Sequence, residues 1–147
     1  MKSKTKSTLL EIICLLFVVL FVYAAFSKIW LYSSFEVQVH QSPLLRSISN
    51  YAWVVLALEL VIAALLIIPK YRLLGLYASL SIMTLFTTYL IVMLNFFDSK
   101  DIPCSCGGIL NTIGWREHIY FNLFFVVISV IGIIISTKQK RNNYHLA

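Results

Sequence analysis

The apolar stretch LLEIICLLFVVLFVYAAFSKIWL (residues 9–31) decides the fold class of this chain. An α-helix rises about 1.5 Å per residue, so about 20 apolar residues are needed to cross the roughly 30 Å hydrocarbon core of a membrane. The stretch reaches that length, and its charged residues are only Glu11 near its start and Lys28 near its end. It therefore predicts a membrane-spanning helix.

Three further stretches pass the same test, at residues 51–68, 73–97 and 118–136. Of the 147 residues, 60% are hydrophobic and 12% are charged, and the mean hydropathy is +0.86. A soluble domain is about 45–50% apolar and about 25% charged, so lipid must solvate much of this surface. The sequence predicts an all-α integral membrane protein, a four-transmembrane-helix bundle that residues 1–147 form as a single domain.

The basic start of the chain raises the question of a cleaved signal peptide. The apolar stretch that follows is longer than the roughly 7–15 residues of the apolar core of a signal peptide, and no small-x-small cleavage site ends it. We therefore expect a retained span.

The basic residues predict which loops face the cytoplasm, where Lys and Arg are enriched. They gather before the first span, in the turn after the second span and after the fourth span, at Lys2, Lys4, Lys6, Lys70, Arg72, Lys138, Lys140 and Arg141. Both termini and that turn are therefore expected inside, and loops 32–50 and 98–117 outside. The net charge of +6 forms no clustered basic face, which argues against nucleic-acid binding.

The first outer loop carries Leu44, Leu45 and Ile48 at helical spacing after Pro43. This spacing predicts a short amphipathic helix at the membrane interface, covering the outer mouth of the bundle. An ordinary connecting loop that packs a few apolar groups is the alternative.

The second outer loop contains PCSCGG (residues 103–108), in which Cys104 and Cys106 are separated by one residue. Neighbouring thiols in an oxidising compartment readily form a disulfide. A bridge across so small a ring gains little from chain entropy and departs from relaxed geometry, which makes it exchangeable. Gly107 and Gly108 allow a sharp turn and let a partner's backbone approach the sulfurs. We expect reversible thiol–disulfide exchange at this pair.

Two other interpretations of the pair stay open. Cys104, Cys106 and His118 could together bind Zn or Cu(I), since all three are soft ligands. The pair could also be purely structural. A further cysteine, Cys14 in the first span, is expected to be a buried small hydrophobe.

Trp115, His118 and Asn122 follow the cysteine loop at i, i+3 and i+7, so they share one helix face beneath it. His118 could carry a proton during thiol exchange, because imidazole titrates near neutral pH. The alternative is that Trp115 belongs to an interfacial aromatic belt and His118 only caps the span.

Glu59 is an intramembrane carboxylate, a costly group that normally has a partner inside the bundle. Lys28 is the cationic candidate, although its depth is poorly matched and its side chain would have to reach inward. A structural contact is expected, and proton handling for a redox centre is the alternative.

The third span carries a polar stripe at helical spacing, formed by Ser81, Thr84, Thr88 and Asn95. Lipid penalises such a stripe, so we expect it to face the other helices as hydrogen-bonding glue. Asn95, at the outer end of the span, is expected near the cysteine loop in depth and is a supporting candidate for the site.

Together these residues resemble the MauE/DoxX group of redox-associated membrane proteins over nearly the whole chain. The ending AAFSKI (residues 24–29) of the first span and Glu59 in LELVIA (residues 58–63) are similar to features of that group, and are weak signals alone. The stretch PCSCGG followed by Trp115, His118 and Asn122 is similar to the branch of the methylamine utilisation protein MauE, and is more specific.

The resemblance implies a bacterial cytoplasmic (inner) membrane location and a role in forming or maintaining disulfides of exported proteins, with a thioredoxin-like partner. The resulting hypothesis is a thiol–disulfide oxidoreductase or redox accessory protein in which Cys104 and Cys106 exchange and His118 manages protons. Trp115 and Asn122 would shape the site, and Lys28 and Glu59 would belong to the architecture.

A different class of hypothesis is a non-catalytic membrane subunit or chaperone whose cysteine pair is structural or binds metal. A quinone cofactor is compatible with the redox role, but nothing in the sequence shows a quinone site. The direction of electron flow, the partner and the nucleophilic cysteine stay open.

Overall fold

The computed structural model describes residues 2–42, 44–97 and 115–145, and every regular element within them is helical. The elements are α1 (Lys2–Trp30), α2 (Tyr32–Gln41), η1 (Arg46–Tyr51), α3 (Ala52–Ile67), η2 (Pro69–Tyr71), α4 (Arg72–Phe96) and α5 (Trp115–His145). The expected all-α class is therefore confirmed for this part of the chain.

Among the described residues, three helical stretches are long and apolar enough to cross a membrane: Thr5–Trp30 in α1, Pro69–Phe96 in η2 and α4, and Arg116–Arg141 in α5. Helix α3 is also apolar but shorter, and its 16 residues extend about 24 Å. These helices indicate a membrane helical bundle. Four complete crossings stay a prediction, because α3 alone falls short of the hydrocarbon thickness.

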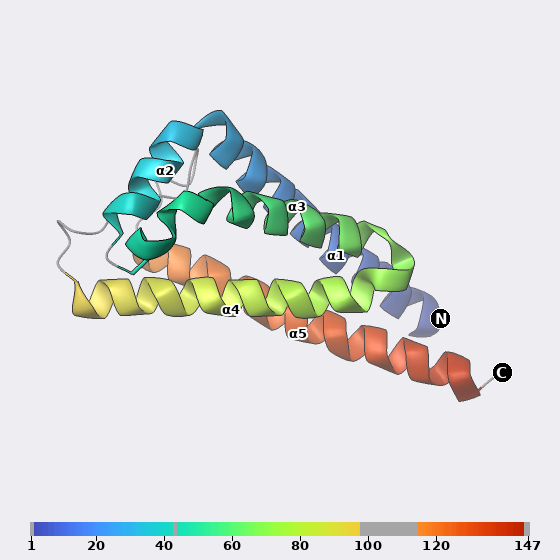
Figure 1. Cartoon of the computed structure of the whole chain (residues 1–147). Coiled ribbons are helices and arrows are strands. Elements are labelled where there is room, and N and C mark those ends of the chain that lie inside the picture. Colours follow the sequence, from blue (N-terminus) through green and yellow to red (C-terminus); the bar gives the residue numbers. More distant parts are fainter. Residues whose placement is uncertain (1, 43, 98–114, 146–147) are drawn as a thin grey trace.

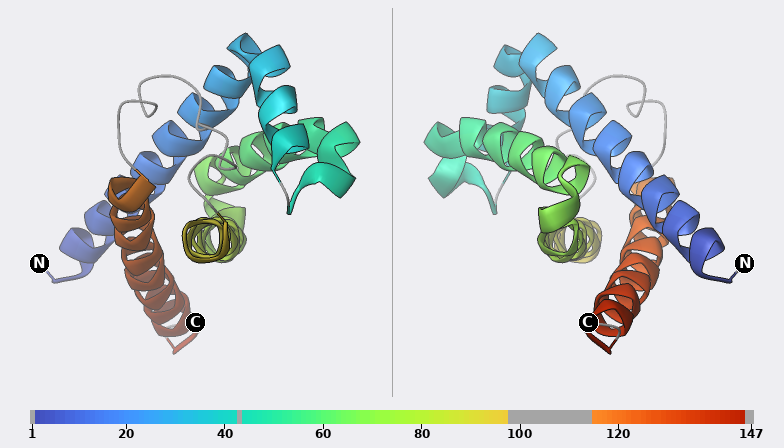
Figure 2. Two further views of the ribbon diagram at one scale, coloured as in Figure 1. Left: turned by 90° about the vertical axis from the view of Figure 1, so that its left-hand side faces the viewer. Right: turned by 90° about the vertical axis from the view of Figure 1, so that its right-hand side faces the viewer.

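Helices α1, α3, α4 and α5 run in alternating directions along the bundle (Figure 1). The N-terminal end of α1, the C-terminal end of α5 and the η2 turn lie at one end of the molecule, and α2 and η1 lie at the other, beside the end of α4 and the start of α5 (Figure 1). Helix α1 packs mainly on α3 and α4 mainly on α5, while α3–α4 and α1–α5 contacts close the bundle, as the view along α4 shows (Figure 2). This arrangement agrees with the predicted grouping of the loops. Which end faces the cytoplasm stays a prediction.

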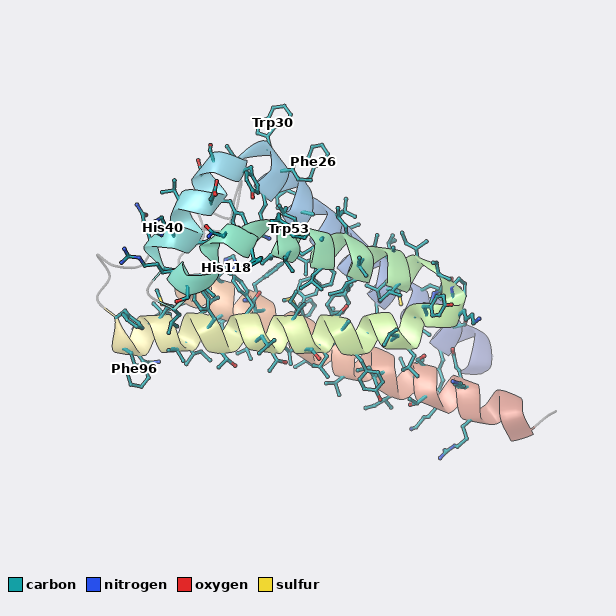
Figure 3. All side chains as sticks on the ribbon, in the orientation of Figure 1. Phe26, Trp30, His40, Trp53, Phe96 and His118 are labelled. Atoms are coloured by element: carbon teal, nitrogen blue, oxygen red, sulfur yellow. The ribbon has the colours of Figure 1, made fainter. Side chains whose placement is uncertain are left out.

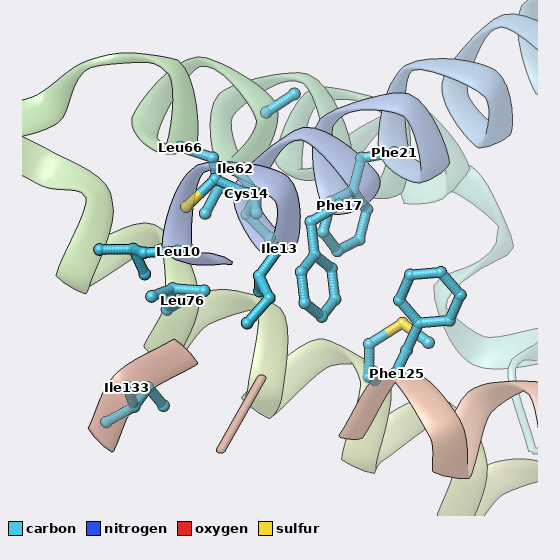
Figure 4. Packing of buried hydrophobic residues seen from close by; sticks show 12 residues of the cluster. Leu10, Ile13, Cys14, Phe17, Phe21, Ile62, Leu66, Leu76, Phe125 and Ile133 are labelled. Carbon is cyan, nitrogen blue, oxygen red and sulfur yellow. The ribbon is translucent and has the colours of Figure 1, made fainter. Parts of the chain in front are cut away.

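The apolar core joins α1, α3, α4 and α5 (Figure 4). Its buried members are Leu10, Ile13, Cys14, Phe17, Phe21, Ile62, Ala63, Leu66, Leu76, Met83, Phe125 and Ile133. Phe17 is fully buried and meets the ring of Phe125 edge-on, with the ring centroids 5.2 Å apart. Cys14 is a free, buried cysteine, which confirms its expected place among the apolar groups.

Large apolar side chains also cover the outside of the bundle, among them Phe26, Trp30, Trp53 and Phe96 (Figure 3). A soluble monomer rarely exposes a continuous apolar surface, whereas a bilayer provides an apolar solvent for it. Tryptophan in particular favours the boundary between lipid and water. The outer surface thus supports the membrane environment that the composition indicates.

The first loop contains a helix, but not at the predicted position. Helix α2 lies upstream of Pro43, and the segment after Pro43 forms a 3-10 helix, η1, in place of the predicted amphipathic α-helix. Proline disfavours the helical conformation in the residue before it, so α2 ends at Gln41. Leu45 is half-buried while Leu44 is exposed.

The prediction that the polar stripe of α4 faces the other helices is wrong. The four side chains are exposed, and each donates a hydrogen bond to the carbonyl four residues earlier in α4. These bonds satisfy the polar groups within the helix, so they need no partner on another helix. The buried face of α4 instead comprises Gly75, Leu76, Ser79, Met83, Thr87, Leu90 and Met93.

Gly75 allows α4 to approach α3 closely. A Cβ atom at this position would lie 3.0 Å from Cγ and Cδ2 of Leu66 and 3.1 Å from its backbone nitrogen. At Gly132 of α5 the nearest atoms would be Cγ2 of Ile13 and Cδ2 of Leu76, both at 3.2 Å. The atoms near Gly132 are ends of side chains that can move, whereas the backbone of α3 cannot move easily.

We therefore expect Gly75→Ala to lower the free energy of unfolding by about 1–3 kcal/mol, because overpacking forces the helices apart. Gly132→Ala should cost less. Both substitutions gain about 1 kcal/mol in helix propensity, so the difference between them reports the packing. Unfolding in mixed micelles, followed by circular dichroism, measures both values. A larger loss at Gly132 would contradict the interpretation.

Candidate functional site

A cavity of about 240 Å³ lies inside the bundle, and residues of α2 form part of its lining. Its lining includes Lys28 from α1, Glu59 from α3, and His118 and Asn122 from α5. Most of the remaining lining is aliphatic or aromatic. Four of the candidate residues from the sequence, on three different helices, thus meet around one space.

Lys28 and Glu59 form an ion pair across the α1–α3 contact. Lys28 Nζ lies 2.5 Å from Glu59 Oε1, and the two side chains are 15% and 9% exposed. The Lys28 ammonium also lies 5.8 Å from the centre of the Phe35 ring. The contact expected for Glu59 is therefore present.

Two buried polar atoms in the cavity lining have no hydrogen-bond partner among the described residues. They are Oε2 of Glu59, whose other oxygen binds Lys28, and Nδ2 of Asn122. Buried polar groups in folded proteins are nearly always paired with protein or ordered water. The cavity therefore offers one free acceptor and one free donor inside an otherwise apolar space.

His118 lies in the first turn of α5 and is buried, with 7% of the residue exposed. Its ring meets the Phe86 ring edge-on at 5.9 Å between centroids and lies 6.3 Å from the Phe121 ring. Figure 3 places it at the end of the bundle where α2 lies. His118 and Asn122 face the same cavity, as their spacing predicts. The side chain of Trp115 lies outside the described set.

Helix α2 contributes a wall that the sequence did not reveal. Phe35 and Val39 of α2 line the cavity, and Ser42 Oγ lies 2.8 Å from Tyr89 Oη, which ties the end of α2 to α4. The apolar residues of α2 alternate with polar ones along the chain, and this pattern is typical of a strand, so the sequence did not indicate a helix here. The i, i+4 spacing of Phe35 and Val39 is the feature of the sequence that indicates a shared helix face.

The other sequence candidates do not join this site. Asn95 is exposed, does not line the cavity and donates to the carbonyl of Ile91. Cys104, Cys106, Gly107 and Gly108 lie outside the described residues. Among the described residues, no group of three or more His, Cys, Asp or Glu side chains could hold a metal ion. The metal interpretation of the cysteine pair is therefore untested.

Comparison with known proteins identifies a family. The model of the family described as methylamine utilisation protein MauE matches residues 6–135 of the chain. This range contains the cavity residues and the cysteine pair. No curated protein and no solved structure matches the chain.

Proposed function

Because the chain belongs to the MauE family of methylamine utilisation proteins, we propose that it is a membrane redox accessory protein whose Cys104 and Cys106 exchange thiol and disulfide with exported or thioredoxin-like proteins. Family membership and the membrane-length helices together indicate a multi-pass membrane protein. The exchange chemistry rests on the residues of the second loop.

The observation that carries the proposal is the closely spaced cysteine pair within the range that matches the family. A bridge between these residues encloses almost no chain, so its value to stability through chain entropy is small. Its value as an exchangeable bond is larger, because strained or exposed disulfides are the labile ones. A redox role thus explains the spacing better than a structural role does.

The fold supports the proposal through the position of His118. In the sequence, the pair lies between the end of α4 and the start of α5, and both of these ends are at the α2 end of the bundle (Figure 1). His118 is buried at that same end, in the first turn of α5. An imidazole there is suited to accept a proton from a thiol and to return it.

In the reducing direction of the proposed exchange, the thiolate of one cysteine attacks the disulfide of the partner. This step forms a mixed disulfide and releases a partner thiolate. The second cysteine, once deprotonated, displaces the other partner sulfur and closes the Cys104–Cys106 bond. Two electrons and two protons pass from the pair to the partner, and the oxidising direction is the reverse.

The thiol state of the pair in native membranes tests this function. We expect alkylation with a mass tag to add two tags after mild reduction that were absent before it, and reoxidation to remove the two sites again. A Cys104→Ser/Cys106→Ser variant, which keeps Cys14, gives the background labelling. A pair that is alkylated before reduction and holds metal would favour a metal-binding subunit. A disulfide that resists reductant would indicate a structural clip.

A further inference from the structure

We propose that the cavity between α1, α3, α4 and α5 binds a small, neutral, lipid-soluble aromatic alcohol. This inference goes beyond the proposed thiol exchange and requires no thiol step. It rests on the size of the cavity, its mixed lining, its two unpaired polar atoms and its internally balanced charge.

The size and lining of the cavity suit a compact ring with one polar end. Its volume of about 240 Å³ is just below the roughly 300–1,000 Å³ of typical ligand pockets, so the occupant must be small. Phe35, Phe86 and Phe121 are among the aromatic residues of the wall. Such walls favour a flat apolar body through stacked or edge-on ring contacts.

The unpaired atoms define the polar end of the ligand. Asn122 is 2% exposed, and its Nδ2 donor has no partner among the described residues; the same holds for the Oε2 acceptor of Glu59. A hydroxyl group both donates and accepts hydrogen bonds. It can therefore pair with either atom, donating to the Glu59 carboxylate or accepting from the Asn122 amide, whereas a carbonyl or an ether can only accept.

The charge of the site calls for a neutral ligand. The charged side chains of the lining are Lys28 and Glu59, which already compensate each other. A charged ligand would leave one buried charge without a counterion, which is costly in a region of low dielectric constant. A phenol-type hydroxyl adds hydrogen bonds and leaves the ion pair in place.

Water alone accounts less well for the cavity. A water molecule takes up about 30 Å³ of liquid and needs two to four polar partners. Water could sit beside Glu59 and Asn122, but most of the lining offers it no partner. An aromatic alcohol places its hydroxyl at the polar atoms and its ring against the apolar wall.

The cavity is also reachable from outside the bundle. Tyr51, the last residue of η1, lines the cavity and is at the same time 62% exposed. Tyr23 of α1 also lines the cavity and is exposed on the outer surface. The cavity is partly open and not fully enclosed, so a lipid-soluble molecule could enter it from the bilayer.

Photolabelling of the full chain in phosphatidylcholine vesicles tests the proposal. The probe is 4-(3-trifluoromethyl-diazirin-3-yl)phenol, and the comparison is the same compound without its hydroxyl group. After irradiation, labelled positions are mapped by mass spectrometry of peptides. We expect the phenol to label α4 residues of the cavity, such as Met83, about tenfold more than the apolar analogue does, as one additional buried hydrogen bond implies.

Matched variants show whether the polar atoms cause this preference. Asn122→Leu should reduce the cavity labelling by the phenol about tenfold, because it removes the donor and leaves the apolar wall. Asn95→Leu makes the same change on the exposed face of α4 and should leave the labelling unaltered. Circular dichroism verifies that both variants are folded, and the comparison of the two probes on the unaltered chain needs no variant.

Three results would overturn the inference. Equal labelling of the cavity by both probes would show a purely apolar space, and labelling confined to lipid-facing residues such as Leu85 would show that neither probe enters. Cavity labelling that survives Asn122→Leu would exclude the proposed hydrogen bond. The readout involves no cysteine, so it is independent of the thiol assay.

Discussion

Replacing Glu59 by alanine is expected to lower the free energy of unfolding by about 3–5 kcal/mol, the cost of breaking a buried ion pair by removing one partner. In the folded protein, Lys28 Nζ is held 2.5 Å from Glu59 Oε1, in a contact that is largely shielded from solvent. Without the carboxylate, the lysine charge stays inside the bundle with no counterion. A charge in that position is expensive for a membrane helix.

Unfolding in mixed micelles measures this loss, and two further variants identify its cause. The Lys28→Met/Glu59→Leu double variant should regain most of the stability, because it removes both charges and retains apolar volume. Glu11→Ala is the matched control, since Glu11 lies 4.0 Å from Arg72 and its side chain is 60% exposed. That variant should lose at most about 1 kcal/mol. A double variant as unstable as the single one would assign the loss to packing and not to charge.

The helices could be predicted from local composition alone. The expected spans 51–68 and 73–97 correspond closely to α3 (Ala52–Ile67) and α4 (Arg72–Phe96). A long apolar run must form its backbone hydrogen bonds within itself when it lies in lipid, so its length determines the helix without tertiary information. Pro69 ends α3 and starts the η2 turn, which follows from the same local chemistry.

Which face of a helix packs inside the bundle is harder to predict than where the helix begins and ends. In water, polar residues mark the outer face of a helix, whereas in lipid they are expected to face inward. Thr84 and Thr88 do not follow the rule for lipid: both are exposed, and their hydroxyls donate to the carbonyls of Leu80 and Thr84 in their own helix. A side chain satisfied in this way carries little information about its neighbours.

The candidate site could be predicted in part. The sequence identified Glu59, His118 and Asn122 as candidate residues, and the three line one cavity. It could not show that Lys28 reaches Glu59, because that depends on the packing of α1 against α3. The contribution of α2 was also hidden, since Phe35 and Val39 meet the cavity only after the chain reverses at the end of α1.

Replacing one cysteine of the pair should turn a transient mixed disulfide into a stable one. If Cys104 is the attacking residue, Cys106→Ser leaves the mixed disulfide with no thiol to resolve it. A disulfide-linked adduct with a thioredoxin-like protein should then accumulate in native membranes and disappear on reduction. Cys104→Ser would form no adduct, and the opposite assignment reverses the two outcomes. Non-reducing gels and mass spectrometry of the adduct identify the partner and the nucleophile.

The same two variants should reduce thiol exchange with the partner to background, because both sulfurs are needed to transfer two electrons and close the bond. Cys14→Ser is the matched control: Cys14 is buried in the apolar core, so its replacement should leave exchange intact. Exchange that persists in both single variants would remove the pair from the chemistry. Loss of exchange together with loss of folding in both would assign the pair to structure, since a redox pair can lose one sulfur and remain folded.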